Sequence, residues 1–345
     1  MNPFRFETSA SVDDTLQRLA RSPGEGTARV VAGGTNLLDL MKLLISPVQR
    51  VIDINALPLQ EITELPGGGL RLGATARNAD TAYHPHVRKR FPLLSAAILA
   101  GASPQIRNMA SNAGNLLQRT RCTYFYDPGV PCNKRQPGSG CPAIGGLTKY
   151  HAILGASPHC IATHPSDMCV ALAALDATVV VTSTRGERRI AFDQFHRLPG
   201  DAPERDTHLE EDELILAIEL PPADAFVAHS AYIKIRERLS YAFALVSVAA
   251  ALALDEDGRI LAARIALGGV AHKPWRDTAA EASLVGARCE AGAFDAAAGQ
   301  LLKQAVPQGQ NAFKIPLARR AIVHALQTAA QGTVDNHGDH REPGR

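Results

Sequence analysis

A long irregular segment in the middle of this chain, residues 101–165, constrains its fold more than any other feature. About 65 residues there show little periodicity, whereas loops without secondary structure rarely exceed roughly 15 residues in a compact domain. Such a segment is functional or is held by something other than packing. It contains four cysteines, Cys122, Cys132, Cys141 and Cys160, on backbone rich in glycine and proline. Converging thiolates on such a backbone suit an iron–sulfur cluster, because nearby N–H groups stay free to bond the sulfurs.

The spacing of these cysteines does not name the metal. Nine, eight and eighteen residues intervene, unlike the CxxC pairs of zinc ribbons and bacterial ferredoxins. A scattered set of thiols without metal therefore stays an alternative. His151, His159 and His164 could each replace one ligand, although turn-forming or surface roles suit them better.

Composition excludes several classes of protein. At 345 residues the chain exceeds the usual size of a single core, which suggests two domains. A hydrophobic share of 46%, a charged share of 20% and a formal net charge of +2 indicate neither disorder nor nucleic-acid binding. We expect no membrane insertion, since no stretch reaches the roughly 18 apolar residues of a spanning helix. The six cysteines favour thiols or metal ligands in a reducing compartment over disulfides.

Hydrophobic periodicity and turn residues predict an α+β chain. Before the irregular segment we expect strands at 4–7, 28–32, 50–54, 59–65 and 70–73 and helices at 11–21, 36–43 and 91–100. After it we expect a helix at 167–175, a hairpin of strands 178–183 and 187–192, and a strand at 214–220. Pro221 and Pro222 mark the expected domain boundary. Beyond it, strands at 231–236, 243–254 and 260–270 and helices at 279–285, 294–305 and 317–330 predict a three-stranded antiparallel sheet backed by helices.

Two turns of small residues are candidate phosphate-binding sites. The first comprises Val31, Ala32, Gly33, Gly34, Thr35, Asn36 and Leu37, and the second comprises Ser111, Asn112, Ala113, Gly114 and Asn115. Glycines at a strand end let the backbone approach a diphosphate, and N–H groups opening the next helix carry partial positive charge. Purely structural turns remain the alternative reading of both. Asp167 could accept a hydrogen bond from a ribose hydroxyl, and Lys234 could reach a cofactor carbonyl or phosphate.

Three motifs in this order resemble a known family. The motifs are Val-Ala-Gly-Gly-Thr-Asn-Leu-Leu-Asp-Leu-Met-Lys (31–42), Gln-Ile-Arg-Asn-Met-Ala-Ser-Asn-Ala-Gly-Asn-Leu (105–116) and His-Pro-Ser-Asp (164–167). In this order they resemble the FAD-binding medium subunits of the xanthine dehydrogenase, or molybdenum hydroxylase, family. The resemblance implies FAD and an FAD-binding domain of the PCMH/VAO type at 1–222, with an insertion at 118–165. It further implies a C-terminal domain like that of CO dehydrogenase flavoproteins at 228–331, followed by a polar tail at 332–345.

The insertion resembles the [4Fe-4S] loop of 4-hydroxybenzoyl-CoA reductases and, more closely, of the flavin subunits of periplasmic aldehyde oxidoreductases. By this resemblance Cys122, Cys132, Cys141 and Cys160 bind a [4Fe-4S] cluster, and residues 31–37 and 111–115 hold the diphosphate and ribityl region of FAD. Asp167 would lie beside the cofactor, and Leu214, Ile215 and Lys234 would border the isoalloxazine ring. Ala113 departs from the glycine of many relatives.

The implied function is electron relay. The resemblance implies a large subunit with a molybdenum cofactor, which hydroxylates the substrate, and a small [2Fe-2S] subunit, which passes the electrons to FAD in this chain. The reduced flavin would then pass them to an external acceptor that the sequence leaves unknown. We expect no catalytic residue in this chain. A flavin subunit of an aromatic acyl-CoA reductase or of another molybdenum hydroxylase is the alternative, and a stand-alone flavin oxidase or a zinc-braced scaffold without flavin are the rivals. The chain shows no export signal, so we expect it in the cytoplasm, or in the periplasm if a partner's twin-arginine signal exports the complex.

Overall fold

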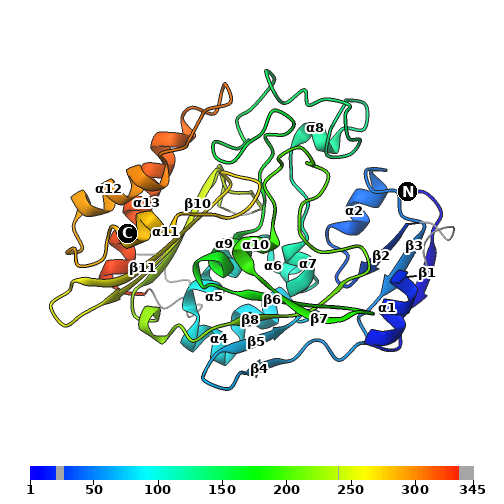
Figure 1. Cartoon of the computed structure of the whole chain (residues 1–345), viewed down its shortest axis with the longest axis horizontal. Helices are drawn as coiled ribbons and strands as arrows, with labels where there is room; N and C mark the ends of the chain where they lie inside the picture. The colour runs from blue at the N-terminus through cyan, green and yellow to red at the C-terminus, as the bar shows by residue number, and fades with distance from the viewer. Residues whose placement is uncertain (21–26, 240, 334–345) are drawn as a thin grey trace.

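The computed structural model describes residues 1–20, 27–239 and 241–333. In Figure 1 these residues form a small parallel sheet, a central antiparallel sheet and a C-terminal antiparallel sheet, with the irregular segment as a lobe above them. The expected α+β class is confirmed. None of the helices in the described ranges is both long enough and apolar enough to cross a membrane.

The parallel sheet has the order β1-β3-β2. It consists of β1 (Arg5–Thr8), β2 (Ala28–Val31) and β3 (Arg50–Asp53), connected through α1 (Val12–Ala20) and α2 (Leu37–Lys42). Helical crossovers are required because parallel neighbours cannot be joined by a tight turn. The end predicted for the first helix, at residue 21, lies outside the described residues.

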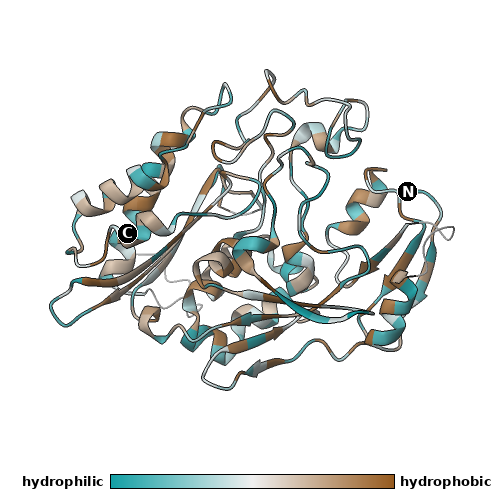
Figure 2. Cartoon of the chain, viewed as in Figure 1, coloured by the Kyte–Doolittle hydropathy of each residue, from teal (hydrophilic) through white to brown (hydrophobic). Residues whose placement is uncertain are grey.

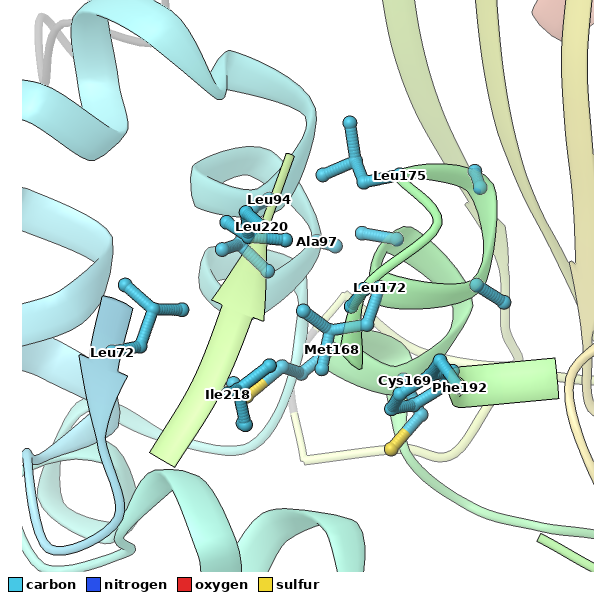
Figure 3. Packing of buried hydrophobic residues seen from close by; sticks show 14 of the residues in the cluster. Leu72, Leu94, Ala97, Met168, Cys169, Leu172, Leu175, Phe192, Ile218 and Leu220 are labelled. Atoms are coloured by element: carbon cyan, nitrogen blue, oxygen red, sulfur yellow. The ribbon is translucent and has the colours of Figure 1, made fainter. Parts of the chain in front are cut away.

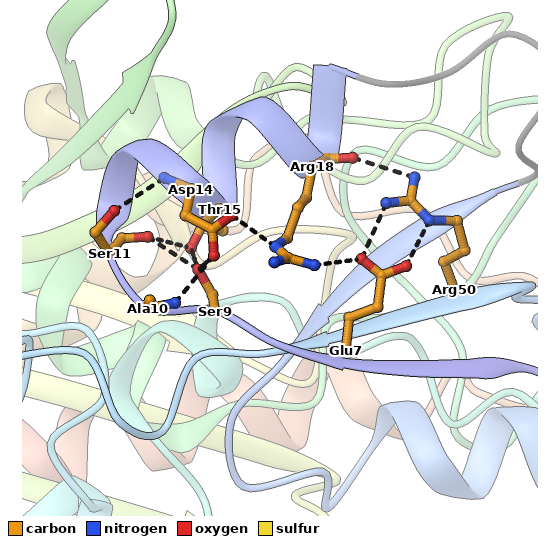
Figure 4. A network of polar contacts seen from close by, with 8 residues as sticks. All are labelled: Glu7, Ser9, Ala10, Ser11, Asp14, Thr15, Arg18 and Arg50. Atoms are coloured by element: carbon orange, nitrogen blue, oxygen red, sulfur yellow. Dashed lines mark hydrogen bonds and ion pairs between the residues drawn. The ribbon is translucent and has the colours of Figure 1, made fainter.

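A polar network fixes α1 on this sheet, as Figure 4 shows. The Ser11 hydroxyl accepts the N–H of Asp14 at 3.0 Å, as expected for a helix N-cap. Glu7 on β1 accepts hydrogen bonds from Arg50 on β3 at 2.8 Å and from Arg18 on α1 at 2.9 Å. The hydrogen bond from Arg50 is the main reason that the pKa of Glu7 is lowered to about 2.

The central sheet has the order β4-β5-β8-β6-β7. Its strands are β4 (Ile62–Glu64), β5 (Leu70–Gly73), β6 (Thr178–Ser183), β7 (Gly186–Ala191) and β8 (Leu214–Leu220). The accompanying helices are α3 (Asn78–Tyr83), α4 (Pro85–Arg90), α5 (Pro92–Ala100), α9 (Asp167–Ala174) and α10 (Phe192–Phe195). Figure 3 shows Met168, Cys169 and Leu172 of α9 within the core that these elements share. Helices α3 and α4 were not predicted, and the strand predicted at 59–65 is limited to β4.

The irregular segment contains three short helices, α6 (Pro104–Arg107), α7 (Asn112–Leu116) and α8 (Thr123–Tyr126). Residues 127–166 contain no helix or strand, although all of them are described. The expected lack of regular structure is confirmed there.

The C-terminal sheet has the order β12-β11-β10-β9. It comprises β9 (Ser230–Ile235), β10 (Val246–Leu254), β11 (Ile260–Gly268) and β12 (Trp275–Arg276), with η1 (Asp224–Phe226), α11 (Thr278–Ala282), α12 (Ala291–Leu301) and α13 (Lys314–Gln331) beside it. The three predicted strands are present, and the two-residue β12 joins them as a fourth. All but residue 332 and Thr333 of the predicted tail lie outside the described residues.

Strand β10 is buried on both faces. Val248 and Leu252 pack into the core formed with the C-terminal helices, while Ala249 and Ala251 pack into the core that contains α9. Figure 2 accordingly shows β10 as hydrophobic along its length, in contrast to the hydrophilic strand β7. The two halves of the chain therefore share a packed interface.

Candidate cofactor sites

A cleft of about 810 Å³ lies where the N-terminal half, the irregular segment and the C-terminal sheet meet. This volume is within the range of roughly 300–1,000 Å³ typical of small-molecule and cofactor sites. Among the residues predicted to bind cofactor, those lining the cleft are Thr35, Asn36, Gly114, Asn115, Asp167 and Lys234.

The other predicted cofactor residues do not line this cleft, namely Val31, Ala32, Gly33, Gly34, Leu37, Ser111, Asn112, Ala113, Leu214 and Ile215. Leu214 and Ile215 are buried in two hydrophobic cores, because β8 is the middle strand of the central sheet. Both lie away from the wall of the cleft, where the isoalloxazine ring was expected. Val31 and Leu37 pack in a small apolar cluster of their own.

Gly33 brings the two predicted turns together. A Cβ added at this position would lie 1.9 Å from the carbonyl oxygen of Met109. Only glycine permits this close approach, which places the turn containing Thr35 and Asn36 beside the turn that begins at Ser111. The absence of a side chain at Gly33 thus allows two backbone segments to come into contact.

The second turn is partly self-bonded and partly open to the cleft. The Ser111 hydroxyl accepts the N–H of Gly114 at 3.2 Å, and buried Asn112 accepts a hydrogen bond from Asn78 at 3.1 Å. Asn115 donates to the side-chain oxygen of Asn78 at 2.7 Å. Asn78 also lines the cleft, but no motif in the sequence pointed to it. Ser111 and Asn112 thus have partners within the protein, whereas Gly114 and Asn115 line a ligand-sized space, and cofactor binding by all four stays a prediction.

Asn36 offers a donor at the cleft. Its side-chain oxygen accepts the N–H of Arg119 at 2.9 Å, and its Nδ2 atom is buried with no partner in the part of the chain that the structure describes. A buried unpaired amide costs free energy unless a bound group satisfies it. The oxygen-rich ribityl and diphosphate groups of FAD are suitable acceptors, so these residues fit that cofactor.

A buried ion pair joins the two halves of the chain at the cleft wall. Nζ of Lys234 on β9 lies 2.8 Å from the carboxylate of Asp167 on α9, and the side chains are only 4% and 7% exposed. The Tyr232 hydroxyl donates to the same carboxylate at 2.7 Å. Burial, followed by the charge of Asp167, raises the pKa of Tyr232 well above its usual value. Lys234 is thus a buried, paired cation at the cleft wall.

At the mouth of the cleft the irregular segment contacts the loop after β9. Lys149 forms an ion pair with Glu237, and the Tyr150 hydroxyl donates to Glu237 at 2.5 Å. Tyr241, with a φ of 52°, also lines the cleft. None of these residues was predicted, although the Arg-Glu-Arg run at 236–238 was a signal for a charged loop beside a ligand site.

All four predicted cluster ligands line one small hollow, together with His151 and Lys134. This hollow has a volume of about 10 Å³, so the cysteine side chains must turn apart to hold a four-iron core. Each of the four cysteines is a free thiol. The structure thus brings together cysteines that are distant in the sequence, from Cys122 to Cys160.

Backbone N–H groups point at these sulfurs. Tyr124 and Phe125 donate to Cys122, and Ala162 donates to Cys160. Cys141 receives three such bonds, from Ala143, Ile144 and Ile161. Hydrogen bonds to the sulfurs are the surroundings that iron–sulfur clusters require. The donor set therefore fits a cluster by its chemistry.

The thiols differ in how readily they ionise. Burial raises the pKa of Cys122 to about 11, whereas the hydrogen bond from the Cys160 thiol lowers the pKa of Cys141 to about 6. The pKa of Cys160 itself is raised, first by this hydrogen bond and then by burial. Because metals bind thiolates, loading this site would release protons.

The spacing of the thiols argues against a single zinc ion. In the described part of the chain, no three of the four sulfurs lie within 4.8 Å of one another. Four thiolates at about 2.3 Å from one zinc would all lie closer together than that. As they lie, the four thiols are therefore not arranged around one zinc ion.

Both halves of the chain clamp the cysteine segment. Lys134, next to Cys132, donates to Pro203 at 2.7 Å and pairs with Asp206. Although burial opposes its ionisation, Asp206 has a pKa held well below its usual value by Lys134. Near the other end, Asn311 donates to the carbonyl of His151 at 3.1 Å and Lys314 to the same carbonyl at 2.9 Å.

Among the described residues, His164, Cys169 and His196 form the one set of potential metal ligands whose donor atoms all lie within 4.8 Å of one another. In each histidine ring one nitrogen already bonds a backbone group. Nε2 of His196 bonds the Leu116 carbonyl at 2.9 Å, and Nδ1 of His164 accepts the N–H of Ser166 at 3.3 Å. Burial lowers the pKa of both rings. These residues belong to the core beneath the cleft, and the surface role suggested for His164 is wrong.

Comparison with known proteins identifies the class of this fold and cleft. The FAD binding domain in molybdopterin dehydrogenase matches residues 2–223, and the CO dehydrogenase flavoprotein C-terminal domain matches residues 230–329. The chain belongs to the family of FAD-binding medium subunits of molybdenum hydroxylases. It is thus the flavin subunit of an oxidoreductase, as the sequence motifs implied.

Individual relatives narrow the similarity. The aldehyde oxidoreductase FAD-binding subunit PaoB of Escherichia coli is 48% identical over 330 residues, which cover 95% of this chain and 99% of that protein. The glyceraldehyde dehydrogenase medium chain of Sulfolobus acidocaldarius is 27% identical over 283 residues, covering 82% and 81%. Among solved structures, carbon monoxide dehydrogenase of Hydrogenophaga pseudoflava superimposes with a TM-score of 0.73 at 26% identity, covering 95% and 97% of the two chains.

Proposed function

We propose that this chain holds FAD in the cleft and a [4Fe-4S] cluster on Cys122, Cys132, Cys141 and Cys160, and that it is the electron-transfer subunit of a molybdenum-dependent aldehyde oxidoreductase. The observation that carries the cluster assignment is the convergence of these four thiols on one hollow, with N–H groups directed at the sulfurs of Cys122, Cys141 and Cys160. The aldehyde assignment is supported by the 48% identity to a subunit named for that activity.

The proposed partners are a large subunit with the molybdenum cofactor and a small [2Fe-2S] subunit. Bound FAD would supply two-electron acceptance and release to an external acceptor. The chain itself would position the flavin: Asn36 and Asn115 offer amide groups to the polar part of the cofactor, and the Asp167–Lys234 pair fixes charge at the cleft wall. We propose that the compartment is set by the partner subunits, and is periplasmic if one of them carries a twin-arginine signal.

A medium subunit acting on another substrate class is the second candidate, because relatives at 26–27% identity carry several different names. The zinc-braced scaffold without flavin is disfavoured by the match of residues 2–223 to an FAD-binding domain. The stand-alone oxidase is disfavoured by membership in a family of subunits.

The test is the iron, acid-labile sulfide and flavin content of the anaerobically purified full chain, with its visible spectrum before and after dithionite. We expect about four irons, four sulfides and one FAD per chain. FAD without iron would overturn the cluster assignment while leaving the family function intact. Oxidation of aldehydes by the chain alone would overturn its role as a subunit.

A further inference from the structure

His151 lies between the two proposed cofactor sites. It belongs to the wall of the 810 Å³ cleft and also to the wall of the cysteine hollow. Cys122 and Thr120 are shared in the same way. At this point the same residues line the cleft on one side and the cysteine hollow on the other, and His151 is 4% exposed between them.

The ring of His151 contacts a proposed cluster ligand. Its Nε2 atom lies 3.1 Å from the Sγ atom of Cys122, and its Nδ1 atom is buried with no partner in the described ranges. The main chain is fixed on both sides, because the N–H donates to Thr148 at 2.9 Å and the carbonyl accepts from Asn311 and Lys314. The imidazole is thus held against this sulfur by contacts with the C-terminal helix α13 and its preceding loop.

The direction of this hydrogen bond follows from the chemistry of the sulfur. A thiolate bound to iron has no proton to give, so the ring nitrogen has to be the donor. A hydrogen bond to a cluster sulfur stabilises the more negative, reduced state over the oxidised state. Removing the donor would then make the cluster harder to reduce, with no need for the fold to change.

We propose that His151 is a positioning residue that raises the reduction potential of the cluster by donating its Nε2–H to Cys122 on the side that faces the flavin cleft. This assignment rests on the proposed function, since it requires the cluster.

The experiment compares His151→Leu, which removes the donor, with His151→Gln, which keeps an N–H group at similar reach. His159→Gln is the matched control: its ring is about half exposed, with Nε2 3.5 Å from Asp201, and it does not line the cysteine hollow although it precedes Cys160 in the sequence. Each anaerobically purified full-length variant is assayed for iron, sulfide and FAD, and its cluster potential is measured by a redox titration followed by electron paramagnetic resonance.

We expect His151→Leu to retain iron and FAD. The equilibrium constant for reduction of its cluster should fall about tenfold, which lowers the reduction potential by roughly 59 mV for one electron. His151→Gln should recover most of this shift, and His159→Gln should show none. An unchanged potential in a fully loaded His151→Leu variant would overturn the inference, as would loss of iron from both His151 variants. Absence of iron from the wild-type chain would instead refute the proposed function.

Discussion

Replacing Asp167 by Asn tests the ion pair at the cleft wall. At an effective dielectric constant of about 20, two unit charges at the observed 2.8 Å attract by roughly 6 kcal/mol, which offsets much of the cost of removing both from water. Asn keeps the shape and still accepts the hydrogen bond from Tyr232, but it leaves the Lys234 ammonium buried without a counter-charge. We expect Asp167→Asn to lower the free energy of unfolding by about 3 kcal/mol.

The double variant Asp167→Asn/Lys234→Met removes both charges and should cost less than either single change, because no buried charge is left unpaired. The assay is urea unfolding of the flavin-free chain for the wild type, both single variants and the double variant, which gives a coupling energy of about 2 kcal/mol or more. Asp295→Asn is the control, since Asp295 pairs with Arg319 where both side chains are about half exposed, and it should cost less than about 0.5 kcal/mol. Costs that simply add in the double variant would refute the reasoning.

Three further changes have separate readouts. Cys141→Ser should lose iron and sulfide yet keep FAD, measured by metal and flavin analysis; equal loss of both would contradict separate sites. Gly33→Ala places a Cβ 1.9 Å from the Met109 oxygen and should reduce the FAD retained on gel filtration by more than half, with near-normal circular dichroism. Glu7→Gln should lower stability at pH 7 by about 1–2 kcal/mol after allowance for solvent screening. Because the pKa of Glu7 falls from 4.5 to about 2, that stabilisation is complete above pH 4.5 and is lost as the pH drops through 2, so urea midpoints of the two proteins should converge there.

Long periodic elements were predictable from the sequence, and short ones were not. The apolar run of β10 and the run of valines in β6 carry their own signal in the order of residues. Helices α3 and α4 have six residues each and meet at His84, before Pro85, so neither completes enough turns to show a period of 3.6. Strand β12 has two residues, which is too few to alternate.

The site was predictable in its motifs but not in its geometry. Family resemblance pointed to residues 31–37 and 111–115, yet which of them face the cleft depends on how the two turns dock through Gly33. That Leu214 does not line the cleft was not predictable for a related reason: position along a strand does not show whether that strand is central or at an edge. Asn78 was missed because its role arises only from contacts with Asn112 and Asn115, which are distant in the sequence.

The convergence of the cysteines is likewise a property of both domains. The segment that carries them has no helix or strand beyond residue 126, so its path is set by what it touches. Ile153 and Leu154 pack in the core of the C-terminal domain, and Lys314, whose pKa is lowered to about 7 by burial, donates to the carbonyls of His151 and Gly269. Without the segment, Lys314 would lose the carbonyl of His151 and keep only that of Gly269. The insertion and the start of α13 are therefore complementary parts of one site, and a change to either should be judged by its effect on the other.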